Sequence, residues 1–78
     1  MDNEYILIIQ LPNQYKIYRV YAPNEKIALH RYINMCTKFM STDNNEHRQY
    51  WQTLKDAALN KDYIIYQSND FLGVREIL

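Results

Sequence analysis

One stretch of this 78-residue chain combines residue types that could do chemistry: YKIYRVY, at residues 15–21, interleaves tyrosines with two cations. Bases of single-stranded nucleic acid stack on aromatic rings while Lys and Arg hold the phosphates. Strand alternation puts Lys16 and Arg19 on opposite faces, and a net charge of zero weakens the attraction for phosphate. As one alternative, the stretch predicts a nucleic-acid surface built from Lys16, Tyr18, Arg19 and Lys26.

Residues that usually carry catalysis or bind metals are few and dispersed. His30 and His47 are the two histidines, fall in different predicted helices and show none of the spacings of a zinc site. Cys36 falls on the apolar side of a predicted helix, where a thiol is an inert core residue. The single glycine, Gly73, excludes a glycine-rich phosphate loop. We expect no enzyme activity, no metal and no cofactor.

Tyrosine is abundant, and its placement indicates another kind of site. Six of the eight tyrosines fall in predicted strands, in which both alternating sets of side chains are apolar or aromatic. A sheet with one face against helices should instead be polar at every second position. One interpretation is that tyrosine is simply a good strand former whose hydroxyl stays in water. The other is that the outer face binds a protein, since tyrosine is enriched at interfaces. The candidate partner-binding residues are Tyr15, Tyr18, Tyr21 and Tyr66, with Arg19 as a polar anchor.

The elements that must position these residues begin and end with strands. EYILIIQ, at residues 4–10, is a nearly continuous aliphatic run, which is typical of a central strand buried on both faces. Pro12 and Asn13 form a turn signal after it. A second turn is predicted at residues 68–70. The four predicted strands are residues 4–10, 15–22, 62–67 and 71–78.

Two helices are predicted between the strand pairs. At residues 24–40, two adjacent apolar rows recur with helical spacing, and Asn24 is a suitable N-cap. The second helix, residues 43–60, begins with a capping box that joins Asp43 to Glu46. The order ββααββ predicts an α+β fold, with an antiparallel sheet of two hairpins and both helices packed on one face.

Length and composition limit the organisation of the chain. No internal repeat or linker divides it, so one domain spanning residues 1–78 is expected. The longest apolar run, residues 5–9, is far too short to cross a membrane. A lone cysteine cannot form an internal disulfide, which fits a reducing compartment. We expect a cytoplasmic protein without a membrane partner.

The passage from Val20 to Leu29 (VYAPNEKIAL) resembles a strand-to-helix entry, A-x-S/N-E-x-x-A-L, of short proteins from phages and mobile elements. The resemblance runs from the first predicted hairpin into the helix and departs from the family pattern at Pro23 and Lys26. It implies a bacterial cytoplasm and a phage or prophage origin. Some proteins of this kind, anti-CRISPR proteins among them, block a host enzyme or defence system by occupying a surface. No functional residue carries over, because the matched positions cap and pack a helix.

The favoured interpretation is therefore a non-catalytic interaction protein. Its tyrosine-rich sheet surface would cover part of a host protein or a second copy of the chain. The unpaired strand edges of two hairpins would also allow a homodimer. Binding of single-stranded nucleic acid through residues 15–21 is the alternative.

Overall fold

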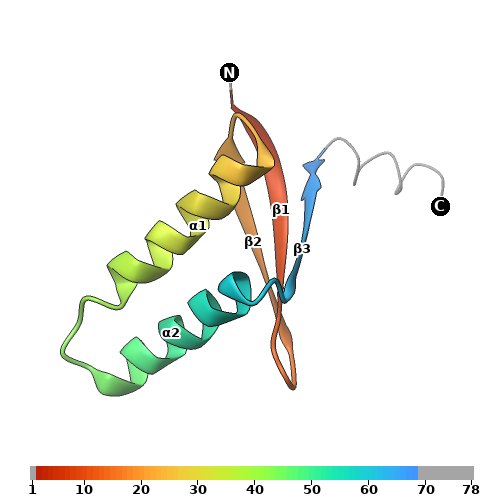
Figure 1. Ribbon diagram of the computed structural model, residues 1–78. Helices are drawn as coiled ribbons and strands as arrows, with labels where there is room; N and C mark the ends of the chain where they lie inside the picture. The colour runs from red at the N-terminus through yellow and green to blue at the C-terminus, as the bar shows by residue number, and fades with distance from the viewer. Residues whose placement is uncertain (1, 69–78) are drawn as a thin grey trace.

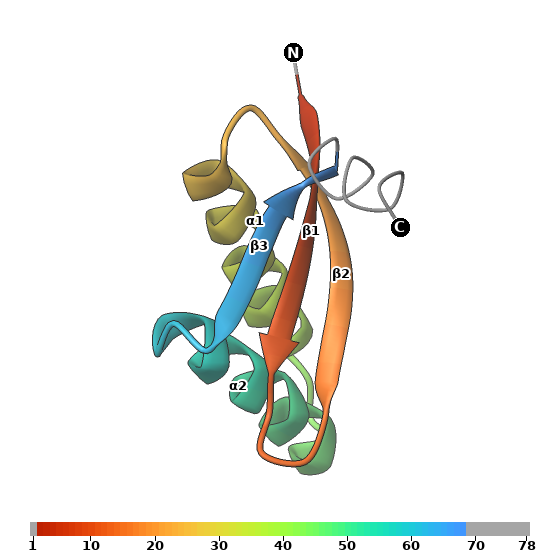
Figure 2. The same ribbon diagram turned by 90° about the vertical axis from the view of Figure 1, so that its right-hand side faces the viewer.

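The computed structural model describes residues 2–68. Its elements, in chain order, are β1 (Asn3–Gln10), β2 (Tyr15–Ala22), α1 (Glu25–Phe39), α2 (Asn45–Leu59) and β3 (Tyr63–Gln67). The strands form an antiparallel sheet in the order β2-β1-β3. Both helices lie on the same side of this sheet (Figure 1). Figure 2 looks onto the opposite side, with the three strands in front and the helices behind them.

β1 is the central strand, as its aliphatic run predicted, and pairs with β2 on one side and β3 on the other. Its side chains alternate between the two faces of the sheet. Tyr5, Leu7 and Ile9 are buried on the face that packs against the helices. Ile6 and Ile8 point to the opposite face and are only partly buried. The strand is thus aliphatic on both faces, although helices cover only one.

The predicted α+β class, with two helices on one face of an antiparallel sheet, is confirmed, but the sheet of two hairpins is not matched. β1 and β2 form the first predicted hairpin, whose loop is closed by a 2.8 Å hydrogen bond from the Leu11 N–H to the Gln14 carbonyl. β3 returns from α2 and pairs with β1. The predicted fourth strand, residues 71–78, lies outside the described residues. Over residues 2–68 the order is therefore ββααβ.

The core lies between β1 and the two helices. Leu7 and Ile9 of β1 are fully buried there. The Tyr32 hydroxyl donates a hydrogen bond of 3.3 Å to the Leu54 carbonyl, so a buried polar group finds a partner and links α1 to α2. Within residues 2–68, no helix has the length and apolar character needed to cross a membrane. The buried helix residues are Ala28, Tyr32 and Cys36 of α1, and Leu54, Ala57 and Ala58 of α2.

Asparagine side chains set the start of each helix. The Asn24 side chain accepts the backbone N–H of Ile27 at 2.9 Å, as predicted for an N-cap. The predicted capping box at Asp43 is wrong. Asn44 caps α2 instead, and its Oδ1 accepts the His47 N–H at 3.0 Å. Asp43 lies one residue too early to reach that N–H, and Asp and Asn are equally good N-caps, so composition alone could not choose between them.

This cap gives a prediction with a neighbouring control. Asn44→Ala is expected to lower the free energy of unfolding by about 1 kcal/mol, because the first turn of α2 loses an acceptor. Asp43→Ala should cost less than about 0.5 kcal/mol, since that side chain does not cap the helix. Urea unfolding followed by circular dichroism measures both. An equal loss in the two variants would contradict the cap at Asn44.

Candidate docking surface on the open face of the sheet

The open face is the side of the sheet turned away from the helices (Figure 2). Strand register places its side chains in rows across the three strands. Ile8 of β1 pairs with Ile17 of β2 and with Ile64 of β3, so three isoleucines form one row. In the next row, Ile6 pairs with Arg19 of β2 and with Tyr66 of β3. The central residues of the open face are Ile6, Ile8, Tyr15, Ile17, Arg19, Tyr21, Ile64 and Tyr66.

Most of these side chains are large, apolar and exposed. Five of them have relative exposures between 39%, for Tyr66, and 62%, for Tyr15. If a large side chain offers roughly 200 Å² when fully exposed, the five present about 500 Å² together. The uncovered face of an antiparallel sheet is ordinarily polar. An apolar area of this size matches the largest patch on a typical monomer, and such patches are often interaction sites.

Polar groups border the apolar rows at the end of the face where β1 begins. The Tyr21 hydroxyl donates a hydrogen bond of 2.9 Å to the Glu4 carboxylate, and the Arg19 guanidinium lies 3.1 Å from the same oxygen. A hydrogen bond from the Ser68 side chain, and next the one from Tyr21, hold the pKa of Glu4 below its ordinary value. The face therefore combines an apolar centre with compensated charges at its border, the pattern of protein interfaces.

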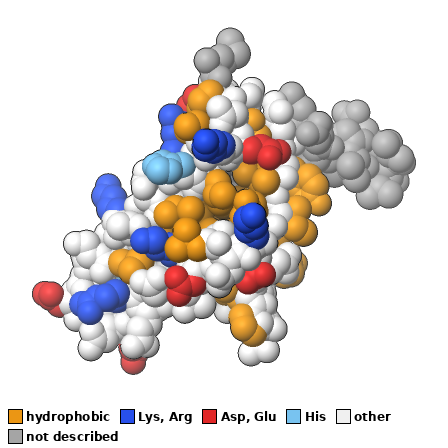
Figure 3. All heavy atoms as spheres, in the orientation of Figure 1, with side chains coloured by type: hydrophobic (Ala, Val, Ile, Leu, Met, Phe, Trp, Pro, Cys, Tyr) orange, Lys and Arg blue, Asp and Glu red, His pale blue; other side chains and the backbone are white. Residues whose placement is uncertain are grey.

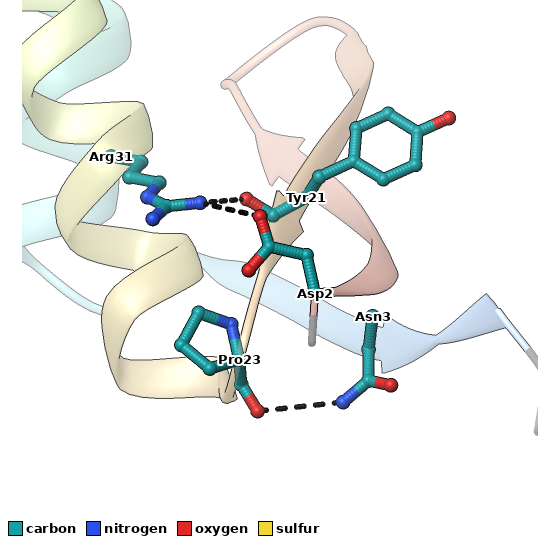
Figure 4. A network of polar contacts seen from close by, with 5 residues as sticks. All are labelled: Asp2, Asn3, Tyr21, Pro23 and Arg31. Carbon is teal, nitrogen blue, oxygen red and sulfur yellow. Dashed lines mark hydrogen bonds and ion pairs between the residues drawn. The ribbon is translucent and has the colours of Figure 1, made fainter.

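A polar network fixes the chain next to this border (Figure 4). Arg31 of α1 donates to the Tyr21 carbonyl and pairs with the Asp2 carboxylate at 3.1 Å. The Asn3 side chain donates to the Pro23 carbonyl at 3.4 Å. These contacts tie the start of β1 to the passage from β2 into α1. They leave the Tyr21 ring pointing away from α1.

Four of the five predicted partner-binding residues lie together on the open face: Tyr15, Arg19, Tyr21 and Tyr66. Tyr18 does not. It belongs to the other alternating set of β2 and faces the helices, where its ring centroid lies 5.2 Å from that of Tyr32. Burial raises the pKa of Tyr18 to about 12. Tyr18 therefore packs against the core.

The residues predicted for nucleic-acid binding are spread over separate surfaces. Arg19 is on the open face, in its ion pair with Glu4. Lys16 and Tyr18 lie on the opposite face of the sheet, and the Lys16 ammonium sits 5.9 Å from the centroid of the Tyr50 ring. Lys26 is on α1. The structure does not bring these four side chains onto one surface.

Sequence reasoning named the tyrosines of the open face but not its isoleucines. Both alternating sets of β2 carry a cation and aromatic residues, so neither is plainly the solvent side. Ala22 could have indicated which set of β2 side chains faces the helices. It is the last residue of β2 before the chain enters α1, and a small side chain at that junction fits the set that faces the helices; in the structure Ala22 is fully buried. The outward set is then Tyr15, Ile17, Arg19 and Tyr21, and pairing with β1 adds Ile6, Ile8 and Ile64.

Two hollows lie on the helix side of the molecule. One, of about 280 Å³, lies between α1 and β3, where hydrophobic side chains gather in Figure 3; its lining includes Glu25 and Lys26. The other, of about 210 Å³, lies between the end of β1 and α2 and is lined in part by Asp56 and Asp62. Across residues 2–68, no group of three or more His, Cys, Asp or Glu side chains is placed to hold a metal ion. Both hollows expose less apolar surface than the open face does.

The described ionisable groups with raised pKa values are in the core or packed against it. Burial raises the pKa of the Cys36 thiol and of the Tyr32 hydroxyl, as it does for Tyr18. The folded protein thus holds these protons more tightly than the unfolded chain, and unfolding at high pH releases protons. The free energy of unfolding therefore falls as the pH rises. The fall begins near the ordinary Cys and Tyr pKa values of 9.0 and 10.0 and extends to about 12.

Alkaline pH is accordingly expected to destabilise the protein. The urea midpoint should be level from about pH 7 to 8 and then decline continuously from about pH 9 to 11. Tyr32→Phe removes one of the groups, so its decline should be shallower, even though its midpoint at pH 7 is lower by one lost hydrogen bond. A midpoint that stays constant up to pH 11 would contradict the burial of these groups.

Comparison with protein-family models, with curated proteins and with solved structures finds no match to this chain. The candidate site therefore rests on the chain's own geometry. It is an apolar, partly aromatic sheet face with a compensated polar border, presented by three strands and backed by two helices.

Proposed function

We propose that this chain is a non-catalytic protein-binding module that docks on another protein through the open face. The observation that supports this is the row of isoleucines, Ile17, Ile8 and Ile64, with tyrosines on both sides, where an exposed sheet face is ordinarily polar. None of these side chains is needed to seal the core, which is closed by the opposite face of the sheet. Their apolar character is explained if a partner covers them.

The size of the face limits the kind of contact. Burying about 500 Å² of apolar surface gives a gross gain of about 12 kcal/mol at 25 cal/mol per Å². Association costs about 4–15 kcal/mol in lost freedom of the two partners. Covering more of the face therefore leaves a larger surplus over this cost. The partner should present a flat apolar surface that covers the tyrosines and isoleucines at once.

A module of this kind acts by occlusion, because whatever surface it covers is closed to other molecules. Occlusion of a host protein is consistent with the resemblance of residues 20–29 to short proteins of phages and mobile elements. A reducing cytoplasm is the proposed compartment, supported by a lone cysteine, Cys36, that is fully buried and free. Nucleic acid is the less supported partner, since the four residues predicted for it lie on separate surfaces and the chain carries no net charge.

The test is capture of the tagged chain's partner from a lysate of the native host, with and without nuclease. Wild type is compared with Ile64→Glu, on the open face, and with Leu59→Glu, an exposed apolar position on α2. We expect one stoichiometric protein that survives nuclease, is retained by Leu59→Glu and is lost with Ile64→Glu. Capture that vanishes with nuclease, or that is unchanged in Ile64→Glu, would contradict the proposal.

A further inference from the structure

We propose that a second copy of this chain is a partner of the open face, and that the two copies pack face to face around a two-fold axis parallel to β1. This inference rests on the proposed function, because it names an occupant of the same surface.

Charge does not oppose the approach of two identical copies. The chain has nine basic and nine acidic residues, so the copies carry no net charge and do not repel at long range. On the open face, the Arg19 guanidinium and the Glu4 carboxylate neutralise each other at 3.1 Å. The isoleucine row itself carries no charge. Two copies can therefore meet without burying an unpaired ion.

The rows of the open face complement themselves under this symmetry. Packed sheets lie about 10 Å apart with their strands roughly aligned. A two-fold axis along β1 keeps each row at its own height and places β2 of one copy opposite β3 of the other. Ile17 and Ile64 both pair with Ile8, so each faces the other across the interface. Arg19 and Tyr66 both pair with Ile6, so the guanidinium faces a tyrosine ring, a favourable contact.

The other face-to-face symmetry fits less well. A two-fold axis perpendicular to the strands, passing over the isoleucine row, exchanges the rows on either side of it. Arg19 would then face Tyr15, a contact as favourable as the one with Tyr66, but Ile6 would face Gln10 of the second copy. Burying the Gln10 amide against an aliphatic side chain is unfavourable. The axis along β1 avoids this contact. It sets Glu4 opposite the Glu4 of the second copy, and each carboxylate keeps its own Arg19 guanidinium at 3.1 Å.

The available area predicts a weak dimer. A standard interface buries about 800 Å² per partner. The five most exposed side chains of the open face supply about 500 Å², and Ile6, Ile8 and Arg19 add to it. Each copy is thus near the lower end of specific interfaces. We expect a monomer–dimer equilibrium that depends on concentration, within reach of sedimentation and light scattering.

A charge exchange in the full chain tests both the contact and the axis. Ile17→Glu alone and Ile64→Lys alone should each weaken the dimer at least about 10-fold, because each sets a charge against an isoleucine of the second copy. The double variant Ile17→Glu/Ile64→Lys places Glu opposite Lys at both contacts. It should therefore bind more tightly than either single variant. Leu59→Glu, of matching exposure to Ile17 (57% against 59%), should dimerise like wild type.

The outcomes separate this inference from the proposed function. A double variant weaker than both single variants would overturn the axis, since β2 would then face β2. A monomer at every concentration would overturn the inference, whether a different protein or residues 69–78 of the same chain cover the face. Suppose that the wild type is a monomer but that Ile64→Glu abolishes capture of a protein from the lysate. The proposed function then stands without the dimer. Circular dichroism confirms that each variant is folded.

Discussion

Replacing Ile9 with alanine is expected to lower the free energy of unfolding by about 2–5 kcal/mol. Ile9 is completely buried on the face of β1 that packs against the helices, in a cluster with Leu7 and Tyr32. The substitution removes buried methylene and methyl groups and leaves a cavity that tightly packed neighbours fill only in part. A domain of 78 residues has a total stability of roughly 4–12 kcal/mol. This single change should therefore remove a large share of it.

The matched control uses the same substitution on the other face of the same sheet. Ile17→Ala should cost less than about 1 kcal/mol, because Ile17 is 59% exposed and loses little contact. Equilibrium urea unfolding of the two variants, at a concentration where the protein is monomeric, gives the comparison. Similar losses at Ile9 and Ile17 would show that the open face is part of the core. The account of two unlike faces would then fail.

Ile17→Glu is expected to weaken binding of the protein captured through the open face at least about 30-fold. Truncating a hot-spot residue near the centre of an interface costs 2 kcal/mol or more, which corresponds to that ratio. The substitution also places a carboxylate where water is excluded, and the cation two residues along the same face of β2, Arg19, is already paired with Glu4. Ile17 belongs to the isoleucine row and is paired with Ile8 of the central strand.

Titration of the purified partner with wild type and variant measures this effect. Ile17→Leu is the conservative control and should bind within a few-fold of wild type, since it keeps the apolar volume. The unfolding free energy of Ile17→Glu should stay close to that of wild type, because the position is exposed. If Ile17→Glu binds as tightly as wild type, the partner's site lies elsewhere on the molecule.

Local signals in the sequence predicted the elements well. The helical spacing of apolar residues and the Asn24 cap predicted α1, which begins at Glu25 and ends at Phe39. The aliphatic run of residues 4–10 predicted a central strand, and β1 occupies that place. Both follow from short-range patterns, because periodicity and capping act within a few residues. The return of β3 to β1 across both helices is a long-range pairing, and no local pattern encodes which strand edge it joins.

The candidate site was harder to predict because the face of a strand residue depends on its pairing. In β2, Tyr18 and Tyr21 are equally good interface residues by type, yet Tyr18 packs near Tyr32 and Tyr21 stands on the open face. A difference of one position in alternation reverses the role of a residue. The aliphatic members of the face were missed for a related reason: an isoleucine in a strand usually belongs to the core.

The most direct test of the open face as a protein-binding surface is a methyl NMR spectrum of isoleucine-labelled protein with and without its captured partner. The account predicts that the methyl signals of the open-face isoleucines shift and gain intermolecular contacts, while those facing the core or on α1 stay in place. Shifts confined to the second group would contradict it. The first group is Ile6, Ile8, Ile17 and Ile64, and the second is Ile9, Ile27, Ile33 and Ile65.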